Sequence, residues 1–279
     1  MRGIRQVLGG PVVIRTPVVF IHGAWLHAVS WESWAERFTA QGFDVRTPGW
    51  PGEPGTVRDA RQRPEALRGL GLGAVIDHYE RLVREFDTPP VLIGHGVGGL
   101  VAQCLIGEGL GRAAVALAPT PVNDVPLPAS QARSWCLADG DAGDDEPVFL
   151  SAEQFRYGIA NTVGVEESFR LYERYAVPAP RRLLVDLGCG TDTRHARARA
   201  DTGNTGRGPL LVVSGQEDRL VPDSVTRAVY RLYGDSTAVS ELKQFADRGH
   251  SLVVDSGWRT VADHVLAWLA VQGVGAFAN

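Results

Sequence analysis

Short runs of apolar and β-branched residues alternate along this chain with longer segments whose apolar residues recur at helical spacing. Such alternation is typical of βαβ units, in which helices join parallel strands. The predicted strands are residues 17–21, 43–47, 90–93, 113–118, 209–214 and 239–245. The predicted helices are residues 30–41, 74–86, 98–107, 224–233 and 259–270. The pattern predicts an α/β fold, with a mainly parallel sheet flanked by helices.

Residues 120–208 interrupt this alternation. They show no clear parallel-strand pattern, and they carry an acidic run at 139–146 that we interpret as a solvated loop. Helical spacing at 152–157 and 165–175 predicts a mainly helical segment. We therefore expect residues 1–119 and 209–279 to form one core and residues 120–208 to form an inserted cap or lid. Residues 53–72, rich in Arg, Pro and Gly, are predicted to be irregular.

The composition bears on location and partners. The 28 basic and 32 acidic residues nearly balance, which argues against a nucleic-acid or anionic-membrane partner. No stretch approaches the roughly 20 apolar residues of a membrane span. The three cysteines, Cys104, Cys136 and Cys189, suggest neither a disulfide framework nor a zinc site. We expect a soluble cytoplasmic protein that acts on a small molecule; the sequence leaves open whether it forms a homodimer.

The turn at residues 94–98 has the form of a nucleophile elbow with one change. Gly-x-Ser-x-Gly between an apolar strand and a helix holds a serine on a sharp, strained turn. Here the sequence is Gly94-His95-Gly96-Val97-Gly98, so Gly96 stands at the nucleophile position. Glycine relieves the turn of strain worth about 1–3 kcal/mol, but it removes the attacking oxygen.

Two later loops fit the remaining members of a catalytic triad. In this arrangement the chain order is nucleophile, acid, histidine. Asp218 follows a predicted strand, and His250 follows the last one. We expect Asp218 to orient His250 as a general base, with Glu217 as the competing acid and Asp124 as a more distant one. In the alternative interpretation, Asp218 caps a helix and His250 lies on a surface loop.

Backbone groups at two turns are candidates for an oxyanion hole. The N–H of Ala24 follows the first strand, and the N–H of Val97 begins the helix after the elbow. Neither depends on the side chain at position 96. No replacement nucleophile is evident, since Cys104 is expected to be packed in the core and Ser251 to point away from His250.

The chain resembles the α/β-hydrolase superfamily, and it is similar to actinobacterial esterase-like members with a helical cap. The resemblance rests on the segments VVFIHGAWLHAVSWESWAERF, LIGHGVGGLVAQ, RGPLLVVSGQEDRLVP and RGHSLVVDSGWRTVADHVLAWL. It implies a mainly parallel eight-stranded sheet, a lid over the site, no cofactor and no metal, and ester or related acyl chemistry. The chain departs from the family at Gly96 and in residues 183–206, which do not align.

Three interpretations of the missing serine follow. His250 and Asp218 act as a dyad on water or on a substrate proton, giving non-covalent hydrolysis, elimination, cyclisation or rearrangement. Alternatively, the protein is a catalytically silent small-molecule binder. The third interpretation is a nucleophile-knockout form of an ordinary serine esterase. The retained dyad favours the first.

Aromatic residues suggest an apolar pocket. The candidates for substrate contact are Trp25, Trp50, Phe155 and Tyr157, with Trp135 as a further residue under the cap. Trp25 is the strongest of these because it directly follows the predicted oxyanion turn. They favour an apolar or aromatic substrate, such as a polyketide-like metabolite of secondary metabolism.

Overall fold

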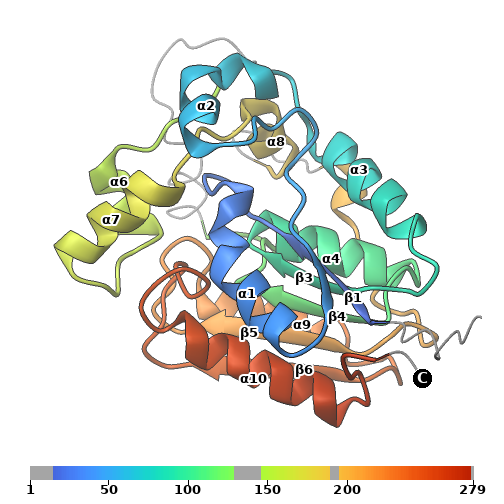
Figure 1. The fold of residues 1–279 in the computed structure, drawn as a ribbon. Coiled ribbons are helices and arrows are strands. Elements are labelled where there is room, and N and C mark those ends of the chain that lie inside the picture. The colour runs from blue at the N-terminus through green and yellow to red at the C-terminus, as the bar shows by residue number, and fades with distance from the viewer. Residues whose placement is uncertain (1–14, 129–145, 189–194, 278–279) are drawn as a thin grey trace, which may run out of the picture.

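A parallel six-stranded sheet forms the centre of the computed structural model, which describes residues 15–128, 146–188 and 195–277 (Figure 1). The strand order is β2-β1-β3-β4-β5-β6, and every neighbouring pair is parallel. The strands are β1 (Pro17–Ile21), β2 (Asp44–Arg46), β3 (Val91–His95), β4 (Ala113–Leu117), β5 (Leu210–Gly215) and β6 (Ser240–Phe245). The predicted α/β fold with a parallel sheet is therefore confirmed.

The number of strands differs from the eight that the resemblance implied. Six strands are found within the described residues. Arg15, just before β1, makes only an isolated antiparallel bridge with Phe277. Residues 1–14 lie outside the described residues, as do Trp135, Cys136, Cys189 and most of the acidic run at 139–146.

Helices cover both faces of the sheet. On one face, α1 (Glu32–Ala40), preceded by the 3-10 helix η1 (Ala28–Trp31), packs with α10 (Trp258–Val271). On the other face lie α3 (Leu72–Arg84), α4 (Val97–Gly107) and α9 (Asp223–Arg231). Strands β1, β3, β4 and β5 are buried along their whole length, as expected for strands covered on both sides.

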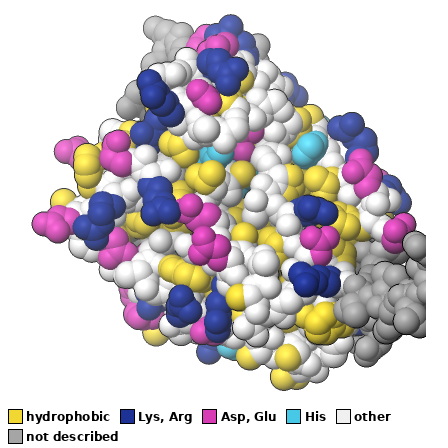
Figure 2. All heavy atoms as spheres, in the orientation of Figure 1, with side chains coloured by type: hydrophobic (Ala, Val, Ile, Leu, Met, Phe, Trp, Pro, Cys, Tyr) yellow, Lys and Arg dark blue, Asp and Glu magenta, His cyan; other side chains and the backbone are white. Residues whose placement is uncertain are grey.

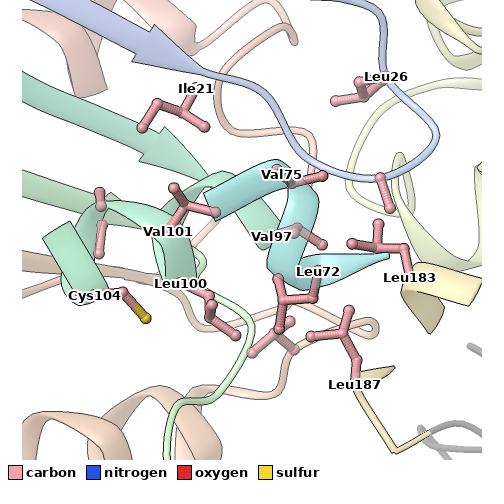
Figure 3. Packing of buried hydrophobic residues seen from close by; sticks show 14 of the residues in the cluster. Ile21, Leu26, Leu72, Val75, Val97, Leu100, Val101, Cys104, Leu183 and Leu187 are labelled. Atoms are coloured by element: carbon pink, nitrogen blue, oxygen red, sulfur yellow. The ribbon is translucent and has the colours of Figure 1, made fainter. Parts of the chain in front are cut away.

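Within the described residues, three helices lie between β4 and β5. They are α6 (Ala152–Gly158), α7 (Val165–Tyr175) and α8 (Arg181–Asp186), followed by the 3-10 helix η3 (Ala196–Ala198). Figure 3 shows Leu183 and Leu187 close to Leu72 and Val97, so this segment continues the apolar core of α3 and α4. None of the described helices is long and apolar enough to cross a bilayer.

The prediction that residues 53–72 are irregular is wrong in part. They contain α2 (Val57–Gln62) and the 3-10 helix η2 (Pro64–Leu67). The Thr56 side chain caps α2 by accepting a hydrogen bond from the Asp59 N–H. Arg61 then donates to the carbonyls of Tyr172 and Ala176, which ties α2 to the end of α7.

The start of α4 crosses β1 so closely that the elbow needs its flanking glycines. A β-carbon on Gly98 would lie 2.0 Å from the carbonyl oxygen of Ile21, and one on Gly94 would lie 1.9 Å from that of Gly98. Both obstacles are backbone atoms, which cannot rotate away. The two glycines therefore allow helix and sheet to approach, which fixes position 96 between them.

We expect Gly98→Ala to lower the free energy of unfolding by about 3 kcal/mol or more, because a methyl group would overlap the Ile21 backbone. Urea unfolding measures the change. Gly55→Ala is the matched control, since a β-carbon there meets nothing within 4 Å. Equal stability of the two variants would contradict this close approach.

Candidate active site

Gly96 forms the turn between β3 and α4. Its backbone has φ +54° and ψ −116°, a conformation that side-chain-bearing residues rarely adopt. Its N–H donates to the Leu117 carbonyl, and its own carbonyl accepts from the Thr120 N–H. A β-carbon on Gly96 would lie 3.3 Å from Nε2 of His250. The bare α-carbon thus faces the imidazole.

His250 and Asp218 are brought together as a buried pair. Nδ1 of His250 lies 2.8 Å from Oδ2 of Asp218, and the two residues are only 3% and 5% exposed. The other carboxylate oxygen accepts from the N–H groups of Leu220 and Val221, each at 2.8 Å. Because a carboxylate only accepts, Nδ1 donates its proton to Asp218, and Nε2 is the ring nitrogen that faces Gly96. Whenever the imidazole is neutral, Nε2 is therefore the acceptor.

The two competing acids lie elsewhere. Glu217 is exposed, and its carbonyl rather than its carboxylate is engaged, by Asn161. The Asp124 side chain is 80% exposed and pairs with Arg199. Asp218 is therefore the acid that contacts His250.

The segment after α6 links the two loops that carry the pair, which the sequence did not suggest. Nδ2 of Asn161 donates to the Glu217 carbonyl, beside Asp218. The carbonyl of Ile159 accepts from the Ser251 N–H, beside His250. No sequence pattern points to these contacts, because they join segments about 60 to 90 residues apart.

His95 supports the histidine loop from beneath. Its Nε2 lies 2.9 Å from the His250 carbonyl oxygen, and the two rings are 4.5 Å apart. Burial, together with the neighbouring His250, holds the pKa of His95 well below its usual value. A neutral His95 can therefore donate from Nε2 to that carbonyl.

A second buried pair, His22 and Glu53, lies behind the turn at Ala24. Nε2 of His22 is 3.4 Å from Oε2 of Glu53, and their side chains are 1% and 2% exposed. Burial by itself would lower the pKa of His22, but the Glu53 carboxylate outweighs it and the pKa is raised. Burial likewise opposes ionisation of Glu53, yet His22 lowers its pKa. The Trp50 ring stacks on His22 at 4.6 Å.

We expect Glu53→Gln to destabilise the protein by about 1–3 kcal/mol, mostly between pH 4.5 and 6.5. The contribution of His22 to the free energy of unfolding is fully present below its pKa of 6.5 in the unfolded chain, and it is lost as the pH rises through its raised pKa in the folded protein. The stabilisation by Glu53 is fully present above its pKa of 4.5 in the unfolded chain, and it is lost as the pH falls through its lowered pKa in the folded protein. Urea unfolding across pH measures this, with the exposed Glu65→Gln as control. A pH-independent difference would contradict the ion pair.

The turn after β1 carries Ala24 and Trp25. Trp25 adopts a φ of +61° and is 2% exposed. Its indole N–H donates to the Val148 carbonyl, and its own carbonyl accepts from the Val177 N–H. Within the described residues, the N–H groups of Ala24 and Val97 donate to no backbone carbonyl.

An apolar cavity of about 250 Å³ lies between this turn and α6. It is lined by Trp25, Leu150, Glu153, Gln154, Tyr157, Gly158, Ile159 and Leu220. The other predicted aromatic contacts are placed differently. Phe155 is fully buried against Tyr172, and Trp50 is 4% exposed beneath His22. Tyr157 is 59% exposed, at the edge of the cavity.

Neither alternative nucleophile faces the site. Burial raises the pKa of the Cys104 thiol to about 12, so it is protonated at neutral pH, and it donates to the Arg197 carbonyl. The Ser251 hydroxyl donates to Asp255, 2.9 Å away. Among the described residues, no group of three or more His, Cys, Asp or Glu side chains is arranged to hold a metal ion.

Known proteins share this architecture. The sequence profile of the alpha/beta hydrolase family matches residues 18–264. No curated protein shows significant sequence similarity to the chain. Similar solved structures include the methylesterase MES16 from Arabidopsis (18% identity, TM-score 0.63, 92% of this chain and 99% of that one). Another similar structure is polyneuridine aldehyde esterase, with 15% identity, a TM-score of 0.65, and coverage of 91% of this chain and 99% of that one. A third is tomato methylketone synthase I complexed with 2-tridecanone, with 13% identity, a TM-score of 0.64, and coverage of 93% of this chain and 99% of that one.

Proposed function

The chain belongs to the alpha/beta hydrolase family, and from that premise we propose that it is an enzyme without a serine nucleophile. His250, oriented by Asp218, is its general base. The substrate is a small apolar or aromatic metabolite, and the reaction needs no cofactor. Gly96 occupies the position of the missing nucleophile.

One observation carries this proposal: Nε2 of His250 faces the space over Gly96, while Nδ1 is held by Asp218. In a serine hydrolase that nitrogen takes the hydroxyl proton. Without the hydroxyl, the space admits a water molecule or a substrate atom, which becomes the group that loses its proton. A positioned base of this kind typically contributes 10²- to 10⁴-fold to the rate.

Backbone donors supply the complementary half of the site. We assign the oxyanion hole to the N–H groups of Ala24 and Val97, which are free of backbone acceptors in the described part of the chain. Val97 is the first residue of α4, so the positive end of the helix dipole reinforces its N–H. Preorganised donors of this type stabilise the negative charge that develops on a substrate oxygen.

The reaction class follows from what occupies the space over Gly96. A water molecule there gives ester hydrolysis without an acyl-enzyme, whereas a substrate C–H or O–H gives elimination, cyclisation or rearrangement. The similar structures include two proteins named as esterases and one named as a synthase. At 13–18% identity they show the fold alone, so the chemistry rests on the site.

We further propose that residues 120–208 act as a cap over residues 1–119 and 209–279. Residues Ile159 and Asn161, directly after α6, bond to both catalytic loops, and α6 borders the apolar cavity. Trp25 and Tyr157 would contact substrate there, whereas Trp50 and Phe155 would support the pocket from behind. Side chains of both charge signs are interspersed on the face in Figure 2, which supports a small-molecule substrate rather than a polyanion. We place the protein in the cytoplasm.

Covalent labelling tests the proposal. A fluorophosphonate ester probe forms a stable adduct with an activated serine, so we expect the intact mass to stay unchanged while turnover of a substrate, found by screening small esters and lactones, continues. An adduct, on Ser251 for example, would contradict a nucleophile-free mechanism. Tight binding of small molecules without any turnover would favour a silent binder instead.

A further inference from the structure

Two cavities meet at the side chain of Tyr157. One is the apolar cavity of about 250 Å³ beside Trp25. The other, of about 530 Å³, we call the arginine cavity; it is lined by Glu153, Arg156, Tyr157, Asn161 and Arg219. Glu153 and Tyr157 line both. A molecule longer than the apolar cavity would therefore extend into the arginine cavity.

The apolar cavity borders the loops that hold the catalytic pair. Leu220 lines the cavity, and its N–H donates to the carboxylate of Asp218. Ile159 lines it too, and its carbonyl accepts from the Ser251 N–H, next to His250. An apolar group in this cavity would thus lie against the residues that position the base.

The arginine cavity is suited to an anion. Its lining carries two guanidinium groups, of Arg156 and Arg219, against the one carboxylate of Glu153. The Arg219 guanidinium lies over the ring of Tyr157, which lines both cavities, 4.9 Å from the ring centroid. Among the described residues, no ion pair joins Arg156 or Arg219 to a carboxylate, so both remain available to a ligand.

We propose that the substrate is amphiphilic, with an apolar body in the apolar cavity and an anionic end, carboxylate or phosphate, held by Arg156 and Arg219. Guanidinium groups suit either anion because they can donate two parallel hydrogen bonds. This inference rests on the proposed function only for the position of the reacting bond. Arg156 and Arg219 determine specificity and take no part in the proton transfer.

Isothermal titration calorimetry of the full chain tests this with four probes: octanoate, octyl phosphate, 1-octanol and propionate. We expect one or both eight-carbon anions to bind at least about tenfold more tightly than 1-octanol, and propionate, which lacks the apolar body, to bind weakly. The relative affinities of octanoate and octyl phosphate identify the anion. The preference should shrink in high salt, because charges at an exposed site are screened.

The double variant Arg156→Gln/Arg219→Gln should lower anion affinity about tenfold, to the level of 1-octanol. The control is Arg170→Gln, an exposed arginine on α7 that lines neither cavity and should leave the affinity unchanged. Equal binding of 1-octanol and both anions, no binding of any probe, or full anion affinity in the double variant would each overturn the proposal. If the anion preference holds while His250→Ala retains full turnover, only the general-base function fails.

Discussion

Replacing His250 with alanine is expected to lower kcat by about 10²- to 10⁴-fold, the usual contribution of a positioned general base. The reason is geometric, since Nε2 is the group that faces the space over Gly96. Steady-state kinetics on the substrate found by screening measure the loss. Binding of product or inhibitor should change much less, because a base acts on the transition state more than on the bound ground state.

His264→Ala provides the matched control, since this histidine lies on α10 and its ring contacts Phe245, outside the site. It should leave kcat unchanged. Asp218→Asn should cost nearly as much as His250→Ala, because an amide in place of the carboxylate favours the wrong imidazole tautomer. Full turnover in His250→Ala, with a melting temperature like that of the wild type, would exclude His250 as the base.

The second large effect concerns Gly96→Ser. A serine β-carbon would lie 3.3 Å from Nε2 of His250, so its hydroxyl would fill the space that we assign to water or substrate. Turnover of the wild-type substrate should fall by about 10²-fold, the loss expected when reacting groups are displaced by about 1 Å. Holding serine at φ +54° should also destabilise the fold by about 1–3 kcal/mol. Kinetics and urea unfolding measure the two effects.

The same variant separates the proposal from the ordinary-esterase alternative. If the chain is a serine esterase that lacks only its nucleophile, the wild type should be inactive and Gly96→Ser should gain strong activity on aryl esters. Gly55→Ser controls for the added hydroxyl, because a β-carbon at that position meets no other atom within 4 Å. Undiminished wild-type turnover in Gly96→Ser would contradict the role given to the space over Gly96.

The strand pattern and the order of the loops made most of the architecture predictable. Strands β1, β3, β4 and β5 are short apolar runs that are buried on both faces, so the apolar composition of these runs is enough to predict them as strands. The chain order of Gly96, Asp218 and His250 led to the expectation of a paired acid and base, and the two side chains lie 2.8 Å apart. The positions of these loops follow from the strands that precede them.

Contacts between distant segments could not be predicted in this way. Glu53 lies in a stretch interpreted as irregular, and its burial against His22 depends on how two loops fold together. The cap of α2 did have a local signal, Thr56 three residues before Asp59, which the Pro- and Gly-rich surroundings obscured. Asn161 has no such signal. Likewise, the aromatic character of Phe155 and Tyr157 does not reveal that one is buried and the other 59% exposed.

A crystal structure with a bound substrate analogue tests the central claim most directly. The account predicts a water oxygen or a substrate atom over Gly96, about 2.6–3.2 Å from Nε2 of His250. Water poised beside an electrophilic carbon would identify hydrolysis, and a substrate C–H or O–H in its place would identify elimination or cyclisation. A ligand bound with its reactive group away from Nε2, and with nothing between His250 and Gly96, would contradict the account.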